Sequence, residues 1–289
     1  MALLAQIERA DGVGVAAAKD HGHFMAIFAG DPAYPGDLDT AARDSLAGLT
    51  RVADVVLAQG REIDIADYRL LPPLRRPGKI ICVGLNYHDH TAEVALEQPD
   101  YPLIFARFPS GLIGHDSDIL RPAISEQLDY EGEFVAVIGK RGKHIAPEDA
   151  LAHVAAYSLF NDVSVRDYQR RTPQWTVGKN FDASGPFGPW LVTPDSLPLG
   201  ARGLRIQTRV NGDTRQDANT DDLVFDVQTL IATLSQAFTL EPGDLIVTGT
   251  SAGVGGARKP PLWLRAGDIV EIEMEGIGIL RNAVKDEQP

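Results

Sequence analysis

The chain has 289 residues, of which 44% are hydrophobic and 23% charged, values typical of a globular protein rather than a disordered one. Its formal net charge is -13, and so acidic a surface repels a phosphate backbone and argues against nucleic-acid binding. A single cysteine, Cys82, excludes an intrachain disulfide and fits a reducing compartment. No apolar run approaches the ~20 residues of a membrane-spanning helix, and residues 1–12 are too short and too charged for a signal peptide. We therefore expect a cytoplasmic protein without membrane contact.

The first quarter of the chain has the features of a small separate unit. Two short strands are predicted within residues 13–30, on either side of a turn-like polar cluster. Residues 37–58 then place apolar side chains at helical spacing. A proline-rich stretch at 72–77 ends regular structure, because proline lacks the backbone N–H that helices and central strands need. We therefore expect a small N-terminal α+β domain at residues 1–75 and a larger domain at 76–289.

Strand signals dominate the larger domain. Residues 204–210 run into Asn211-Gly212, a dipeptide typical of a two-residue hairpin turn. Strands and helices do not alternate regularly, which argues against a doubly wound nucleotide-binding sheet. The expected fold class is therefore α+β and strand-rich. The other predicted strands are 79–83, 130–138, 245–247 and 269–274, and the predicted helices are 147–156 and 224–240.

Two acidic residues open the strand predicted at 130–138. Side chains of a strand alternate between its faces, so Glu131 and Glu133 point the same way, roughly 7 Å apart. Val135 and Val137 continue that face, which indicates that it becomes buried. A solvated strand end is the alternative, and the acidic face at 271–275, which never becomes apolar, is an example of one. Spacing alone leaves both interpretations open.

A third carboxylate strengthens the case for a metal site. Asp162 ends an apolar run that begins at Leu159. Three converging carboxylates favour a hard cation, namely Mg²⁺ or Mn²⁺, with Ca²⁺ as a further candidate. Zinc fits less well, because the chain has no cluster of Cys and His ligands.

A histidine and a glutamate follow the strand predicted at 79–83. If residues 88–96 are helical, His90 and Glu93 are neighbours on one face. A histidine held by a carboxylate is suited to activate water as a base. A pair of surface residues is the alternative for so short a motif.

A polar stretch after the third carboxylate supplies candidate substrate-binding groups. Arg166, Gln169 and Lys179 lie there, and a cation beside a metal can hold a substrate carboxylate or a developing enolate. Surface charge is the alternative interpretation. We assign Arg170 and Arg171 to the surface.

A glycine-rich loop at 249–256 follows another predicted strand. It lacks the Gly-Lys-Ser/Thr ending of a nucleotide-binding P-loop. Its backbone amides are suited to cradle an anionic group, and a plain flexible turn is the alternative.

Together these segments resemble the fumarylacetoacetate hydrolase family. The resemblance covers roughly residues 76–285, and a family-like small domain precedes it. One such motif would carry little weight, whereas five in the family's order are highly specific. The five are Gly84–Tyr87 with His90 and Glu93, Leu128–Glu133 continuing to Lys140, Asn161–Gln169, Gly178–Asp182, and the Gly249-Thr250 loop.

The resemblance implies a mixed β-sheet roll with the active site at its mouth, usually in a homodimer. It implies that the metal-binding catalytic domain is the one at 76–289, with Mg²⁺, Mn²⁺ or Ca²⁺ on Glu131, Glu133 and Asp162. His90 and Glu93 would form a dyad on a short lid helix that activates water. The remaining roles implied are stabilisation of an enolate by Lys179 and substrate binding by Arg166, Gln169 and Thr250.

Two positions depart from the family pattern. Arg107 stands where the family usually has a lysine, and arginine is not a neutral replacement for lysine at a site. We assign Arg107 to substrate binding. Ser251 stands where proline is typical. Both departures concern the far end of the substrate and leave the metal end unchanged.

The function implied is hydrolysis of a carbon–carbon bond in a 2,4-dioxo acid, either an acylpyruvate or a sugar-derived 2,4-diketo acid. The paired oxygens of such a small anionic 2-oxo acid suit a metal Lewis acid. The alternative is a decarboxylase, tautomerase, isomerase or hydratase that acts on a 2-oxo acid such as oxaloacetate through the same enolate. A non-catalytic metal- or ligand-binding protein is a further alternative, and the presence of His90, Glu93 and Lys179 argues against it.

Overall fold

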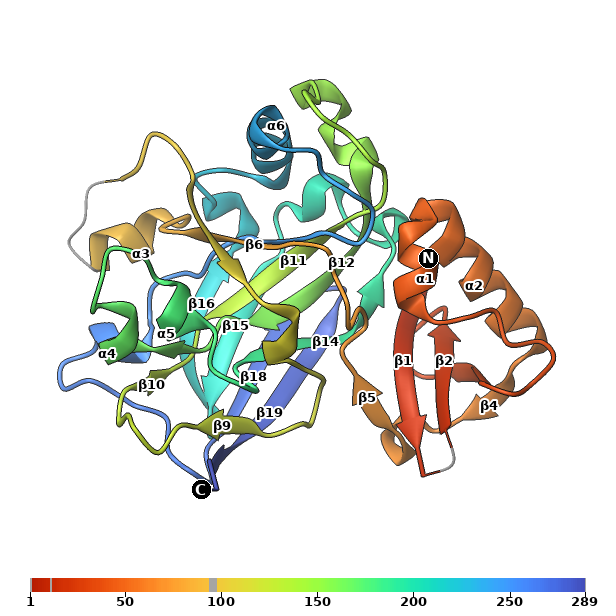
Figure 1. Ribbon diagram of the computed structural model, residues 1–289, viewed down its shortest axis with the longest axis horizontal. Coiled ribbons are helices and arrows are strands. Elements are labelled where there is room, and N and C mark those ends of the chain that lie inside the picture. The colour runs from red at the N-terminus through yellow and green to blue at the C-terminus, as the bar shows by residue number, and fades with distance from the viewer. Residues whose placement is uncertain (1, 11, 94–97, 289) are drawn as a thin grey trace.

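Two β-sheets form the framework of the computed structural model, which describes residues 2–10, 12–93 and 98–288 (Figure 1). The larger sheet contains β1 (Leu3–Arg9), β2 (Gly12–Ala18), β3 (Phe24–Phe28), β4 (Arg61–Ile63), β5 (Arg69–Leu71), β6 (Ile80–Gly84), β7 (Leu103–Arg107), β8 (Leu112–Ile113), β11 (Gly132–Ile138), β12 (Val154–Asn161), β14 (Gly185–Val192) and β17 (Leu245–Val247). The smaller sheet contains β9 (Ile119–Arg121), β15 (Arg205–Val210), β16 (Asp213–Asn219), β18 (Ile269–Met274) and β19 (Gly278–Asp286). A short pair, β10 (Leu128–Asp129) with β13 (Ser164–Val165), lies beside them.

The larger sheet is mixed. Within the described residues its order is β4-β3-β2-β1-β14-β12-β11-β17-β6-β7, and β5 and β8 pair with β1 and β14. Strands β6 and β17 run parallel, whereas β11 runs antiparallel to both of its neighbours. The smaller sheet has the order β16-β15-β18-β19-β9. This arrangement confirms the strand-rich fold class predicted from the sequence.

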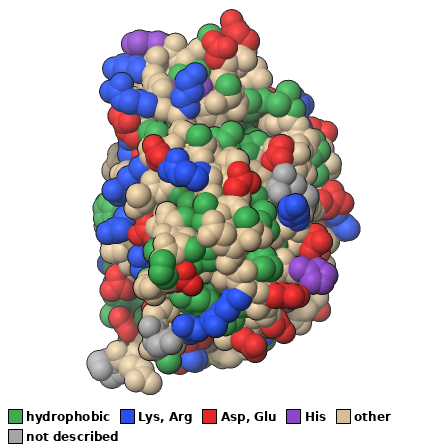
Figure 2. Space-filling model, turned by 90° about the vertical axis from the view of Figure 1, so that its right-hand side faces the viewer, with side chains coloured by type: hydrophobic (Ala, Val, Ile, Leu, Met, Phe, Trp, Pro, Cys, Tyr) green, Lys and Arg blue, Asp and Glu red, His purple; other side chains and the backbone are tan. Residues whose placement is uncertain are grey.

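Apart from α6 (Val227–Ala237), the helices gather at two ends of the molecule (Figure 1). They are α1 (Leu38–Arg43), α2 (Ser45–Gln59), α3 (His88–Glu93), α4 (Arg166–Gln169) and α5 (Thr176–Lys179). Helices α1 and α2 lie beside β1 and β2, while α3, α4 and α5 lie at the opposite end (Figure 1). On the face that carries α1 and α2, basic and acidic side chains are interspersed (Figure 2). No helix in the described ranges is both long and apolar enough to cross a membrane.

Strand β11 separates two hydrophobic cores. All seven of its residues are buried. Phe134 and Ile138 enter one core, whereas Val135 and Val137 enter the other. Because strand side chains alternate between faces, Glu133 begins the face that continues with the two valines. The predicted burial of that acidic face is therefore observed.

The N-terminal strands belong to the larger sheet. Strand β1 pairs with β14, so that Leu3 lies opposite Val192. It also pairs with β2 and β5. One continuous sheet thus joins the N-terminal unit to the remainder of the chain, and the domain boundary at residue 75 stays a prediction.

Two predicted helices differ from the observed elements. The segment predicted as a helix at 147–156 is a 3-10 helix at Pro147–His153, followed directly by β12. Strand β12 is buried between β11 and β14, and this pairing overrides the local helical spacing. The helix predicted at 37–58 is divided into α1 and α2, because Ser45 has a φ of 75°, which an unbroken α-helix does not allow. Strand β1 was not predicted.

The predicted hairpin turn is confirmed. Val210 of β15 lies opposite Asp213 of β16. Between them Asn211 and Gly212 have φ values of 54° and 82°, as a type I′ turn requires.

Helix α6 offers a test of its N-terminal cap. Asp226 precedes the helix, and its side chain accepts the backbone N–H of Thr229 at 2.8 Å. We predict that Asp226→Ala lowers the free energy of unfolding by about 1 kcal/mol, measured by chemical denaturation. Asp226→Asn keeps a capping oxygen and should stay within a few tenths of a kcal/mol of wild type. Equal losses in both variants would contradict a capping role.

Candidate active site

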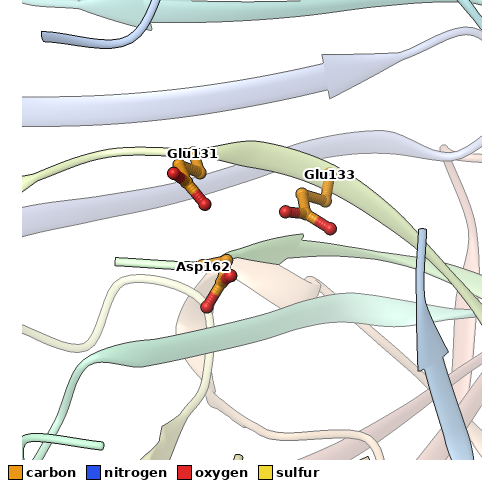
Figure 3. Close-up of side chains that lie close together, drawn as sticks. All are labelled: Glu131, Glu133 and Asp162. Carbon is orange, nitrogen blue, oxygen red and sulfur yellow. The ribbon is translucent and has the colours of Figure 1, made fainter. Parts of the chain in front are cut away.

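Three carboxylates converge where β11 begins beside the end of β12. Gly132 is paired with Asn161, so the residues just beyond them, Glu131 and Asp162, lie side by side. The N–H of Asp162 donates to the carbonyl of Glu131 at 2.9 Å. Glu133 lies on the same face of β11. Carboxylate oxygens of the three acids lie within 4.8 Å of one another, and all three residues are buried (Figure 3).

Buried cations neutralise two of these acids. Lys179 Nζ lies 2.6 Å from Glu131 Oε2 and 2.7 Å from Asp162 Oδ2. Arg166 contacts the other oxygen of Glu131 at 2.6 Å, and Arg107 contacts the other oxygen of Asp162 at 2.5 Å. Burial alone would raise the pKa of Glu131, but the charges of Lys179 and Arg166 outweigh it and lower that pKa to about 2. Glu131 is therefore anionic across the physiological pH range.

Glu133 lacks such a partner. Among the residues that the structure describes, no Lys or Arg forms an ion pair with it, and its Oε2 accepts the N–H of Gly249 at 2.5 Å. Burial, together with the charges of Asp162 and Glu131, raises the pKa of Glu133 well above its ordinary value. Positive charge is therefore missing at this point of the site.

The donor set fits a hard divalent cation. The triad supplies only carboxylate oxygens, which Mg²⁺, Mn²⁺ and Ca²⁺ prefer to nitrogen or sulfur. A divalent ion held by Glu131, Glu133 and Asp162 would supply the charge that Glu133 lacks. The structure thus contains an acidic triad able to bind a divalent metal.

Helix α3 carries the predicted histidine–glutamate pair. His90 is 8% exposed, and its Nδ1 lies 3.3 Å from Glu93 Oε2. The other oxygen of Glu93 accepts the N–H of Gly253 at 3.0 Å. Asp89 accepts the N–H of Ala252 at 3.3 Å. The side chains of Asp89 and Glu93 thus attach α3 to the glycine-rich loop. The contact of Glu93 with this loop also fixes the carboxylate that faces His90.

The glycine-rich loop is itself fixed. Asp129, which is buried, accepts the N–H groups of Gly255 and Gly256, both at 2.8 Å. Arg166 Nε donates to the same carboxylate at 2.7 Å. Gly253 has a φ of 106°, and a Cβ there would lie 2.0 Å from the carbonyl oxygen of Arg215. The amides of residues 255 and 256 therefore cradle an anionic group, as predicted for the loop, and that group is a carboxylate of the protein itself.

Thr250 has little hydrogen-bonding capacity left in its side chain. Its hydroxyl donates to the carbonyl of Gly132 at 3.0 Å and accepts from Gln216 Nε2 at 2.7 Å. A hydroxyl has one donor, so this side chain can only accept a further hydrogen bond. Its predicted contact with an anionic substrate would therefore use the backbone N–H.

A cavity of about 420 Å³ brings most of the predicted residues together. Phe105 and Trp175 add an aromatic wall, with ring centroids 5.4 Å apart in an edge-on arrangement. Arg170 also lines this cavity, contrary to its assignment to the surface alone. The predicted residues that line it are His90, Glu93, Glu131, Glu133, Arg166, Gln169, Lys179 and Thr250. Their individual roles stay predictions.

Arg107 lies elsewhere than predicted. Its side chain is buried behind Asp162, outside the cavity wall. Besides Asp162 it donates to the carbonyl of Val163 at 3.1 Å and to Ser184 Oγ at 2.7 Å. The structure therefore corrects the assignment to substrate binding: Arg107 positions Asp162. Sequence patterns do not reveal the direction in which so long a side chain points.

Other site residues were missed or only partly recognised. Asn86 was noted only as part of a motif, yet its amide bridges the carbonyls of Thr248 and Phe225 at 2.6 and 3.0 Å. It thereby fixes the segment that leads into α3. Asp129 likewise belongs to a family-like segment that predicts no role for it. The sequence around Trp175 and Phe105 has no pattern that would predict that they line a cavity.

Removal of the unpaired carboxylate tests the metal site. We predict that Glu133→Gln weakens Mn²⁺ binding more than about 100-fold, measured by titration calorimetry. Loss of a group that only orients a metal ligand typically costs about 10- to 100-fold in affinity, and loss of the ligand itself should cost more. The amide oxygen can still accept from Gly249, so the fold should persist. Glu271→Gln, on the partly exposed strand β18, is the control and should bind Mn²⁺ as wild type does.

The same carboxylate predicts a pH dependence. Its pKa is raised in the folded protein, so the metal-free protein holds a proton there that the unfolded chain releases near its ordinary pKa. The resulting stabilisation is present at low pH and is lost as pH rises through the raised pKa. Metal competes with that proton, so Mn²⁺ affinity should rise over this window in wild type. An affinity independent of pH would contradict the assignment.

The positioning role of Arg107 is tested by Arg107→Lys. An ammonium cannot reproduce the fork that joins Asp162, Val163 and Ser184. We predict about tenfold weaker Mn²⁺ binding, measured by calorimetry. Arg51→Lys, at an exposed ion pair with Asp44, should have no effect, and unchanged affinity in both variants would refute the role.

Known proteins resemble this chain over nearly its whole length. A family model described as fumarylacetoacetate (FAA) hydrolase C-terminal matches residues 79–285. Human mitochondrial oxaloacetate tautomerase FAHD2A is 41% identical over 265 residues, 91% of this chain and 84% of the human protein. Fumarylacetoacetate hydrolase from the psychrophile Exiguobacterium antarcticum superposes with a TM-score of 0.83 at 36% identity, over 99% of this chain and 100% of that one. Maleylpyruvate hydrolase from Sphingobium sp. SYK-6, solved in complex with manganese(II) and pyruvate, superposes with a TM-score of 0.80 at 29% identity. This match covers 99% of this chain and 100% of that one. The chain therefore belongs to the fumarylacetoacetate hydrolase family.

Proposed function

We propose that this protein is a metal-dependent keto–enol tautomerase that acts on oxaloacetate or a similar 2-oxo acid. The observation that carries the proposal is the content of the cavity: an acid–base pair, His90 with Glu93, shares it with Glu131 and Glu133 of the carboxylate triad and with the Lys179 ammonium. Interconversion of keto and enol forms requires a proton donor and acceptor and a positive environment for the enolate between them.

The charges around the triad favour an enolate once a metal is bound. Asp129 and the triad contribute four buried carboxylates, and the buried cations are Arg107, Arg166 and Lys179. With these groups ionised, a divalent cation changes the net charge of this cluster from minus one to plus one. When bound, such a cation supplies a Lewis acid for the paired oxygens of the 2-oxo acid.

The side chains have distinct tasks in this proposal. Glu93 holds His90 Nδ1, so Nε2 is left to move the proton at the substrate carbon. Two N–H groups of Lys179 are used at 2.6 and 2.7 Å, and the third has only a 3.4 Å contact with a carbonyl. That third N–H is available to donate to the enol oxygen. Burial would lower the pKa of Lys179, but Asp162 and Glu131 raise it, which keeps the ammonium charged.

The relatives support tautomerisation over the carbon–carbon hydrolysis that led the expectations from sequence. The human relative named as an oxaloacetate tautomerase is 41% identical, whereas the solved fumarylacetoacetate hydrolase and maleylpyruvate hydrolase are 36% and 29% identical. Hydrolysis also requires a positioned water and a departing carbon fragment. Tautomerisation needs only the groups described above.

Loss of the histidine tests the proposal. We predict that wild type with Mg²⁺ or Mn²⁺ accelerates the decay of enol absorbance in oxaloacetate solutions and that a chelator abolishes the effect. His90→Gln should lower kcat at least about 100-fold, because a general acid–base contributes a factor of this order or more. His88→Gln, an exposed position on the same helix, is the matched control and should retain activity.

Product analysis distinguishes the alternatives. Release of CO₂ with pyruvate would identify a decarboxylase. Cleavage of an acylpyruvate into pyruvate and a carboxylic acid would identify a hydrolase. Enol decay at the uncatalysed rate with every metal would reject the tautomerase.

A further inference from the structure

Arg170 lies one helical turn beyond Arg166. Its backbone N–H donates to the carbonyl of Arg166 at 3.1 Å, which ends α4. Residues four apart lie on one face of a helix, so the two guanidinium groups stand on the same side. Arg166 is buried, whereas Arg170 is exposed at the mouth, and both line the cavity.

The protein uses most of the hydrogen-bonding capacity of the two inner cations of the cavity, leaving Arg166 Nη2 and the third N–H of Lys179. Arg166 bonds to Asp129, Glu131 and Gln169. Lys179 bonds to Glu131 and Asp162. By contrast, the guanidinium of Arg170 makes neither an ion pair nor a hydrogen bond with any residue in the described ranges. Toward the described residues, this cation of the cavity wall has its full capacity to bind an anion unused.

The neighbouring arginine provides a contrast. Arg171 packs over the ring of Tyr168, with its guanidinium carbon 3.7 Å from the ring centroid, and it does not line the cavity. Adjacent positions with the same side chain therefore have different surroundings. Of these two adjacent arginines, Arg170 is the one that faces the space that a substrate would fill.

The chemistry of the cavity selects the ligand of Arg170. Buried Glu131, Glu133 and Lys179 form a polar inner end. Phe105 and Trp175 form an aromatic side wall, and exposed Arg170 provides a cation at the mouth. A guanidinium binds carboxylates through paired N–H groups. The chain as a whole carries a charge of -13, so an unpaired cation here offsets the repulsion of an entering anion.

We propose that Arg170 is a specificity-determining residue that binds the distal carboxylate of a dicarboxylic 2-oxo acid. This inference rests on the proposed function, which places the 2-oxo acid end of the substrate at the triad. The cavity of about 420 Å³ leaves room between the two ends for a short carbon chain. A monocarboxylic 2-oxo acid would gain nothing from Arg170.

The test compares a dicarboxylic with a monocarboxylic substrate. Oxaloacetate and phenylpyruvate both have enols that absorb in the ultraviolet, so one assay follows both. Arg170→Gln should lower the ratio of kcat/KM for oxaloacetate to that for phenylpyruvate about tenfold, as expected for loss of a charge-assisted hydrogen bond. The loss should appear in the KM of oxaloacetate. Arg170→Lys should restore part of the preference, and Arg171→Gln should leave it unchanged.

A binding measurement keeps this test separate from that of the proposed function. Malate and lactate are stable 2-hydroxy acids with and without a distal carboxylate, and calorimetry with Mn²⁺ present measures both. Arg170→Gln should weaken malate about tenfold more than lactate, whether or not wild type turns over any enol. If wild type turned over no enol but Arg170→Gln still weakened malate more than lactate, the tautomerase would be rejected and the carboxylate site retained. Equal effects on both acids, or no effect on either, would overturn the role of Arg170.

Discussion

One constraint shapes the site: three carboxylates that repel one another are held within 4.8 Å in a buried place, so the surrounding residues must compensate their charge. Antiparallel pairing of β11 with β12 forces this approach, because Glu131 and Asp162 directly adjoin the paired residues Gly132 and Asn161. Unpaired buried charge is costly. Lys179 and two arginines compensate most of it and leave Glu133 without a cation. The arrangement is therefore incomplete without added positive charge.

The smaller sheet also contributes to this convergence. A Cβ on Gly132 would lie 2.0 Å from Thr208 Oγ1 of β15, so only glycine lets that strand approach the start of β11. The N–H of Gly132 donates to Gln216 of β16 at 2.9 Å, and the same amide group holds Thr250. The glycine between the two glutamates is thus the point where both sheets and the glycine-rich loop meet. Its place between the two acids follows from packing as well as from chemistry.

Sequence reasoning identified what depends on local periodicity. The alternation from Glu131 to Val137 left a buried face and a solvated strand end open, and the structure shows the buried face. The helical spacing of His90 and Glu93 agrees with the observed contact of their side chains. It failed where long-range pairing decides, as in β12. It also failed for the long side chain of Arg107, whose direction is set by tertiary contacts. The family resemblance supplied the convergence of segments that no local pattern contains.

One hydrogen-bonded chain connects the two chemical parts of the site. Arg166 bonds to Glu131 of the triad and to Asp129. Asp129 in turn holds the glycine-rich loop, whose Gly253 N–H holds the carboxylate of Glu93 beside His90. Fixed contacts thus join the triad to the acid–base pair. The aromatic wall and the mouth stand outside this chain, so substitutions there can alter which acid is bound while the metal and proton-transfer groups keep their geometry.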